Sequence, residues 1–248
     1  MQMFDRLVAV MARLRGPDGC DWDRAQNFAS IAPYTIEEAY EVADAIARDD
    51  PAALKDELGD LQLQVVFHAA IAADRGAFGI DDVLAGIVDK MERRHPHIFG
   101  GAEGADWEAI KAAERANAAV TGALGGVALG LPALLRAEKL QRRAARVGFD
   151  WHDAAGPRAK IDEELVEVET ATDAAHRAEE VGDLLFAVVN WARHLGVDAE
   201  AALRAANGKF EARFAAMEAL DPAFPERSLD EQEALWNRVK QDAAQRQG

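Results

Sequence analysis

The chain has 248 residues, half of them hydrophobic, and its 44 acidic and 28 basic residues give a net charge of −16. This acidity argues against a broad nucleic-acid surface and against binding to an anionic membrane. Cys20 is the single cysteine, so no intrachain disulfide can form. The N-terminal segment lacks the apolar core of a signal peptide, and no apolar run has membrane-spanning length. We therefore expect a cytoplasmic protein.

Helix-forming residues dominate the composition and strand-forming residues are sparse, so helices are expected throughout. Residues 35–48 are predicted as a helix that begins after Thr35, which is a good N-cap residue. Residues 52–74 are predicted as the helix that follows it. In the second half of the chain, residues 158–170 and 176–195 are expected to form the corresponding pair of helices.

Between these pairs lies an uncharged segment rich in Ala and Gly, residues 116–131. Such a composition is typical of a linker. Pro132 follows it and stands where a new helix can begin. We therefore predict an N-terminal module at residues 1–115 and a C-terminal module at residues 132–248.

The two halves carry the same sequence markers in the same order. In the first half these are Asp21-Trp22, Glu37-Glu38-x-x-Glu41, Glu57-x-x-Asp60, Lys90 with Arg94, and Trp107 with Lys111. In the second half they are Asp150-Trp151, Glu163-Glu164-x-x-Glu167, Glu180-x-x-Asp183, Lys209 with Arg213, and Trp236 with Lys240. This order predicts a tandem duplication, with an all-α four-helix bundle in each half.

The repeated acidic pairs are predicted to converge on a divalent cation. Each pair is spaced three residues apart on one helix, so two antiparallel helices can aim four carboxylates at one point. Their mutual repulsion calls for a cation, and oxygen ligands without His or Cys favour Mg²⁺, with Mn²⁺ as a substitute. One such match arises about once by chance in so acidic a chain, and a solvated acidic face is then the alternative. The second copy favours a metal site in each half, formed by Glu38, Glu41, Glu57 and Asp60 and by Glu164, Glu167, Glu180 and Asp183.

Basic and aromatic markers near the C-terminus are candidates for binding phosphate and base. Lys209 and Arg213 share a helix face and can bind phosphate oxygens, while pairing with Glu211 is the ordinary alternative. Trp236 and Lys240 also share a face, so the indole can stack on a base while the ammonium group reaches phosphate. Packing of this indole against the bundle explains its position equally well.

The sequence resembles the MazG family of nucleoside triphosphate pyrophosphohydrolases, in the all-α NTP pyrophosphatase superfamily. The segments that carry the resemblance are APYTIEEAYEV, ELGDLQLQVVFHA, KMERRHPHIF, LPALLRAEKLQRRAARVGFDW, EELVEV, EEVGDLLFAVVNWARHLG and NGKFEARF. The resemblance implies hydrolysis of a broad range of NTPs and dNTPs to monophosphate and pyrophosphate, by a homodimer. It also implies Mg²⁺ bound by Glu164, Glu167, Glu180 and Asp183, with Lys209, Arg213, Trp236 and Lys240 binding the nucleotide. Glu163 is the candidate base that orients the attacking water.

The two halves differ at positions that matter for a ligand. Asn190 and Asn207 of the second half correspond to Phe67 and Val88 of the first. Amide groups can position a ligand through hydrogen bonds, whereas these apolar side chains cannot. The C-terminal module is therefore predicted to be the main catalyst, and the N-terminal module structural or weakly active. Where relatives often place a Lys before the second acidic pair, this chain has His176-Arg177. If that Lys contacts phosphate, Arg177 must take over the contact or the affinity falls.

Three other functions compete with this interpretation. The nearest is a pyrophosphatase specific for dUTP or dCTP, which a panel of substrates would distinguish. A second is a regulator that binds nucleotides without turnover. A di-iron carboxylate protein is disfavoured, because such sites carry Glu-x-x-His and no His stands at that spacing after Glu38, Glu57, Glu164 or Glu180.

Overall fold

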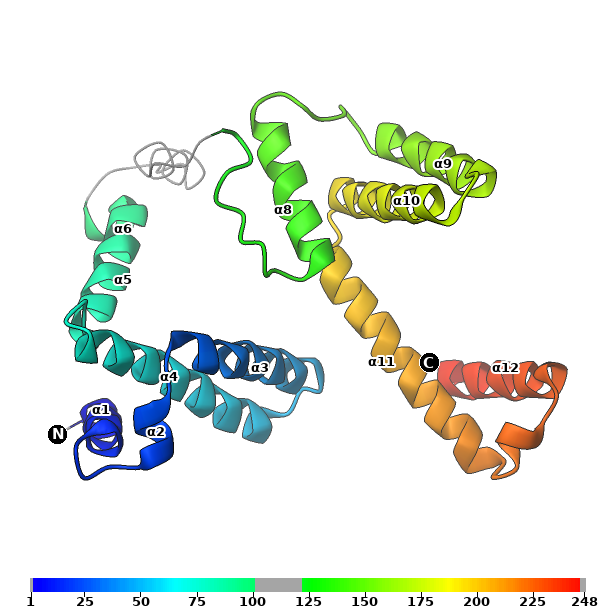
Figure 1. Ribbon diagram of the computed structural model, residues 1–248. Helices are drawn as coiled ribbons and strands as arrows, with labels where there is room; N and C mark the ends of the chain where they lie inside the picture. Colours follow the sequence, from blue (N-terminus) through cyan, green and yellow to red (C-terminus); the bar gives the residue numbers. More distant parts are fainter. Residues whose placement is uncertain (1, 101–121, 246–248) are drawn as a thin grey trace. The chain divides into compact units, whose positions relative to one another are not determined.

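The computed structural model describes residues 2–100 and 122–245. Every regular element within these ranges is a helix, which confirms the all-α fold (Figure 1). The chain divides into two compact units, Met1–Ala118 and Ala119–Gly248. Of the predicted linker, residues 122–131 are described and form turns and bends without a helix, whereas residues 116–121 lie outside the described ranges.

The N-terminal unit is organised around a hairpin of two long antiparallel helices. Its helices are α1 (Met3–Arg15), α2 (Asp21–Ala25), α3 (Phe28–Ala47), α4 (Pro51–Asp74), α5 (Ile80–Arg94) and α6 (Pro96–Phe99). Helices α3 and α4 pack along each other, and α1 packs against α4 (Figure 1). The buried core comprises Met11, Ile31, Val66, Phe67 and Ile71.

The predicted start of the first hairpin helix is wrong, because Thr35 lies inside α3 rather than at its N-cap. Asn27 caps this helix, and its Oδ1 accepts hydrogen bonds from the backbone N–H groups of Ala29 at 2.9 Å and Ser30 at 3.2 Å. The helix then continues through Pro33. The Thr35 hydroxyl is instead hydrogen-bonded to His68 Nε2 of α4, at 2.9 Å.

The C-terminal unit repeats the hairpin and extends it. Its helices are α8 (Ala133–Arg146), α9 (Ala155–Thr170), α10 (Ala174–His194), α11 (Ala199–Leu220), the 3₁₀ helix η1 (Phe224–Glu226) and α12 (Leu229–Gln245). Helices α9 and α10 form the antiparallel pair, with α8 packed against α10 and α12 folded back along α11 (Figure 1). Asp173 caps α10 by accepting hydrogen bonds from the Ala175 and His176 backbone N–H groups, both at 2.9 Å.

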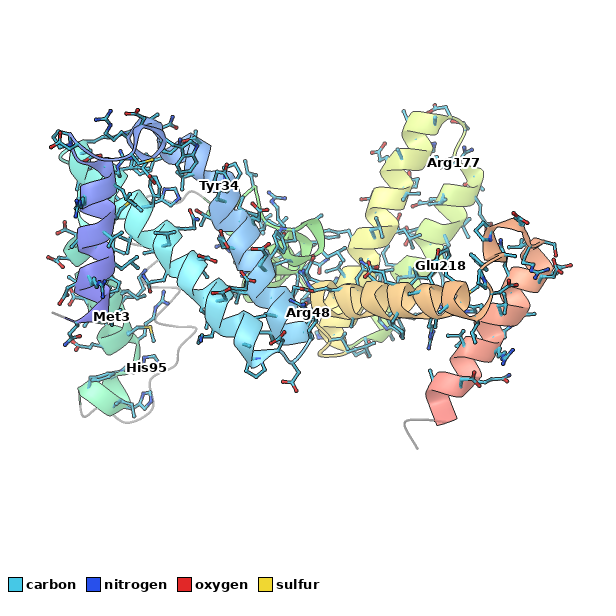
Figure 2. All side chains as sticks on the ribbon, turned by 90° about the horizontal axis from the view of Figure 1, so that it is seen from below. Met3, Tyr34, Arg48, His95, Arg177 and Glu218 are labelled. Atoms are coloured by element: carbon cyan, nitrogen blue, oxygen red, sulfur yellow. The ribbon has the colours of Figure 1, made fainter. Side chains whose placement is uncertain are left out.

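The described helices place the sequence markers at defined positions. Arg177 lies in the first turn of α10, near the turn that joins it to α9 (Figure 2). Trp107 and Lys111, which close the first repeat, lie outside the described residues. Among residues 2–100 and 122–245, no helix combines the length and the apolar character needed to cross a membrane.

Candidate active site

The α9–α10 hairpin brings the acidic residues of the second repeat together. Carboxylate oxygens of Glu164, Glu180 and Asp183 all lie within 4.8 Å of one another. Glu164 belongs to α9, whereas Glu180 and Asp183 lie one turn apart on α10. Antiparallel packing of these two helices therefore forms the cluster, as the three-residue spacing predicts.

Glu164 is the buried member of this cluster, with only 3% of its surface exposed. Its Oε1 accepts a hydrogen bond from the Lys160 ammonium at 2.6 Å. Its Oε2 is buried and has no hydrogen-bond partner among the described residues. An anionic oxygen is costly to bury without a partner, so this atom is suited to binding a cation.

Glu167 adjoins the same cluster. Desolvation raises its pKa, and the neighbouring charges of Glu164 and Glu180 raise it further. The structure thus gathers Glu164, Glu167, Glu180 and Asp183 at one place. Their role as metal ligands remains a prediction.

The raised pKa of Glu167 gives a test of the metal-free cluster. A carboxyl with a higher pKa in the folded than in the unfolded state is destabilising when ionised, and this destabilisation disappears as the pH falls toward the unfolded value. We therefore expect Glu167→Gln to raise the melting temperature of the metal-free protein at about pH 7 and to have little effect near pH 4.5. Scanning fluorimetry at several pH values measures this difference, and a lower melting temperature at neutral pH would contradict it.

Two basic side chains at the cluster were not identified from the sequence. Lys160 contacts Glu163 at 2.9 Å and Glu164 at 2.6 Å, and these hydrogen bonds raise the pKa of its ammonium group. His176 Nε2 lies 3.0 Å from Glu180 Oε1. Both basic residues precede their carboxylate by four positions on one helix, a spacing that the sequence contains and that favours such pairs.

Glu163, the candidate base, lies at the edge of this arrangement. Its side chain is 57% exposed and its carboxylate pairs with Lys160. Glu163 is not one of the three residues whose carboxylate oxygens lie within 4.8 Å of one another. Its role in orienting water stays a prediction, and Lys160 is the group that holds its carboxylate in place.

The N-terminal unit has a corresponding cluster. Carboxylate oxygens of Glu38, Glu41 and Glu57 lie within 4.8 Å of one another. Burial raises the pKa of Glu38, and the neighbouring charges of Asp60 and Glu41 raise it further. The charge of Asp60 also raises the pKa of Glu57, so Asp60 lies near this cluster, and the duplication extends to the three-dimensional arrangement.

The C-terminal cluster opens onto a cavity. This cavity, of about 440 Å³, is lined by Glu164 and Asp183 and by aromatic side chains of Phe149, Trp151 and Phe186. The N-terminal unit has a pocket of about 560 Å³ between α1 and α4 and a second of about 150 Å³ beside Trp22 and Phe67, and neither of these two pockets is lined by a residue of the acidic cluster. The C-terminal unit therefore joins a candidate metal site to a cavity for an organic group.

The wall of the cavity depends on a glycine. An added Cβ at Gly156 would lie 2.0 Å from Cδ1 of Trp151, so the indole packs directly over this residue. The indole of Trp151 also lines the cavity.

A network of polar residues borders the cavity. The Arg193 guanidinium donates to Asp150 Oδ2 at 3.0 Å and to Asn190 Oδ1 at 2.9 Å. His194 Nε2 lies 3.0 Å from the same Asp150 carboxylate. The hydrogen bond from Arg193, assisted by His194, lowers the pKa of Asp150 to about 2. Asp150 is thus a charged anchor that aligns Arg193.

The remaining predicted substrate residues do not line this cavity. They are Arg177, Asn207, Lys209, Arg213, Trp236 and Lys240. The Arg213 guanidinium lies 5.5 Å from the centre of the Trp236 ring, which packs against Phe210 at 5.4 Å. Arg177 donates to the Ala171 carbonyl at 3.4 Å. Trp236 therefore has a packing role within its unit, and nucleotide contacts by these residues stay predictions.

Sequence comparisons agree with this architecture. A family model described as the MazG nucleotide pyrophosphohydrolase domain matches residues 26–99, and one described as phosphoribosyl-ATP pyrophosphohydrolase matches residues 138–209. The chain is 48% identical to the nucleoside triphosphate pyrophosphohydrolase of Escherichia coli K12, with 97% of this chain and 98% of the relative covered. It is 44% identical to the nucleoside triphosphate pyrophosphohydrolase/pyrophosphatase MazG of Thermotoga maritima, over 96% of each chain.

Each of the two hairpins carries an acidic cluster, and together with these matches they identify the chain as a hydrolase that acts on acid anhydrides. The chain belongs to the MazG family of nucleoside triphosphate pyrophosphohydrolases.

Proposed function

We propose that the C-terminal unit hydrolyses NTPs and dNTPs with a broad range of bases, in a Mg²⁺-dependent reaction that releases monophosphate and pyrophosphate. The observation that carries this proposal is the buried, unpartnered Oε2 of Glu164 beside Glu180 and Asp183, at one end of a large cavity. It supports a cation at the cluster, with the nucleoside in the cavity.

Glu164, Glu167, Glu180 and Asp183 would hold the cation. When bound, Mg²⁺ supplies charge neutralisation for the triphosphate and Lewis-acid activation of water. The carboxylate of Glu163 is exposed and lies beside the cluster, where it can accept a proton from the attacking water.

Lys160 has a positioning role in this scheme. Its ammonium group contacts both Glu163 and Glu164, so it fixes the direction of two neighbouring carboxylates. It also offsets part of the repulsion that desolvated acidic groups experience. The aromatic walls of the cavity provide surfaces on which a base can stack.

Product analysis tests the reaction directly. One purified NTP is incubated with the protein and Mg²⁺, and pyrophosphate and orthophosphate are measured separately. We expect pyrophosphate and monophosphate in equal amounts, and no reaction in EDTA. Release of orthophosphate alone would overturn the proposal, and use of only one nucleotide in a panel would contradict the broad base range.

We also propose that the protein forms a homodimer. Large apolar side chains on the α9–α10 hairpin are exposed to solvent, among them Leu165 (44%), Val166 (57%) and Leu185 (52%). Apolar surface of this kind favours burial against a second copy of the same chain. Sedimentation at several protein concentrations would show a dimer, and a monomer throughout would contradict it.

A further inference from the structure

Two side-chain amides on the cavity wall have a fixed polarity. The first is Asn190, whose Oδ1 accepts from Arg193 Nε at 2.9 Å and from Nη2 at 2.7 Å. A guanidinium group carries donors only, so the atom that faces it must be the amide oxygen. The amide nitrogen consequently faces away from Arg193, and no described residue accepts a hydrogen bond from it. Asn190 itself lines the cavity.

Asp150 prevents this arrangement from reversing. It binds Arg193 through both carboxylate oxygens, and the Arg193 side chain is only 10% exposed. If the Asn190 amide turned over, its NH₂ group would face the guanidinium and two charge-assisted hydrogen bonds would be lost. Asn190 is therefore held as a hydrogen-bond donor.

The second amide belongs to Gln141 of α8. Its Nε2 donates to the Phe186 backbone carbonyl at 2.8 Å. Because a carbonyl only accepts, the atom facing it must be the amide nitrogen. Oε1 is then left buried, without a hydrogen-bond partner in the described parts of the chain. Gln141 is therefore held as an acceptor, and it lines the same cavity.

The two amides line the same cavity at neighbouring turns of α10. Phe186, which fixes Gln141, precedes Asn190 by one turn on the same face of α10. The aromatic rings of Phe149 and Trp151 line the cavity around them. The wall thus offers an oriented donor and an oriented acceptor between surfaces suited to stacking.

We propose that Asn190 and Gln141 form a fixed donor–acceptor pair that binds the pairing edge of the nucleobase, with Arg193 and Asp150 as positioning residues. The inference rests on the proposed function, which places the nucleoside in the cavity. All the common bases carry an acceptor beside an N–H on this edge, so a single pair serves a broad range of nucleotides. Hydrogen bonds to this edge, combined with stacking, are a general means of binding an unpaired base.

A substrate that lacks the exocyclic amine tests the acceptor. Purine riboside triphosphate keeps the ring acceptor of ATP but has no N–H for Gln141. We expect wild-type kcat/KM for it to be about tenfold below that for ATP, mainly through KM, which corresponds to about 1.4 kcal/mol. Gln141→Met should lower kcat/KM for ATP by a similar factor. Its kcat/KM for the analogue should stay within about twofold of the wild-type value.

Gln232→Met is the matched control, since Gln232 also donates to a backbone carbonyl, that of Phe224, at 3.2 Å. It does not line the cavity, and its replacement should affect both substrates alike. If Gln141→Met lowers kcat/KM equally for the two substrates, the role of Gln141 is structural and the proposed pair is overturned. If wild type releases no pyrophosphate from ATP, the proposed function fails instead, so the two failures are distinguishable.

A double-mutant cycle tests the positioning role of Arg193. We expect Arg193→Met to raise KM for ATP about fivefold with kcat little changed. In a protein that already carries Asn190→Leu, the same substitution should raise KM by less than a further factor of about two. Arg193→Lys keeps a positive charge beside Asp150 and should recover part of the affinity. Calorimetric binding of AMP provides a second readout. Fully additive effects on KM and on AMP affinity would overturn the positioning role.

Discussion

Replacing Glu180 with alanine is expected to reduce pyrophosphate release about 1,000-fold, which corresponds to about 4 kcal/mol of transition-state stabilisation. Glu180 belongs to the three-carboxylate cluster that faces the cavity, together with Glu164 and Asp183. Removing one carboxylate weakens cation binding at the point where the triphosphate must be neutralised. The measurement is steady-state hydrolysis of one NTP at saturating Mg²⁺.

Glu179→Ala is the matched control for this variant. Glu179 precedes Glu180 on α10, is exposed, and does not belong to the cluster. The Glu179→Ala substitution removes the same charge from the same helix, so the hydrolysis rate of this variant should stay within about twofold of wild type. Circular dichroism establishes that both variants are folded. Unchanged hydrolysis by Glu180→Ala would exclude catalysis by a cation at this cluster.

The duplication supplies a second comparison with a large expected difference. Asp183→Asn is expected to lower kcat/KM at least about 100-fold, since one carboxylate charge is lost at the cavity. Asp60→Asn makes the same change at the corresponding position of the N-terminal unit. There the pockets of about 560 Å³ and about 150 Å³ are not lined by any residue of the acidic cluster, so we expect less than about threefold loss of kcat/KM.

Kinetics of the two variants, measured with one NTP and with one dNTP, decide between the units. Equal losses would show that both clusters contribute to hydrolysis. A larger loss in Asp60→Asn would reverse the predicted division of labour. Melting curves recorded in parallel separate a change in chemistry from a change in stability.

The sequence was sufficient to predict both hairpins and both acidic clusters. A three-residue spacing on a helix depends only on local geometry, and antiparallel packing follows from the short connections between the helices. The start of α3 was predicted incorrectly, because Thr35 has N-cap chemistry but Asn27 provides the cap together with Ser30. Two residues with capping chemistry in one region cannot be ranked without knowing which segment is helical.

The polar wall of the cavity could not be predicted in the same way. Asp150 and Arg193 are separated by 43 residues, and Gln141 meets the Phe186 carbonyl across 45 residues. Such contacts depend on how α8 and the segment before α9 fold against α10, which no local spacing encodes. Lys160 and His176 are different, because each lies four residues from its partner and local spacing alone could have identified them.

Phe67 shows how the first copy differs from the second at the position of a cavity residue. It occupies the position of Asn190, is only 4% exposed, and packs with Met11 and Ile71 in the core. Ala70 stands where the second copy has Arg193, so an asparagine introduced at position 67 would have no guanidinium to orient it. The substitution would bury an unsatisfied amide and weaken the core. A second donor site of this kind in the N-terminal unit would therefore need several simultaneous substitutions, which makes the difference between the halves hard to remove one residue at a time.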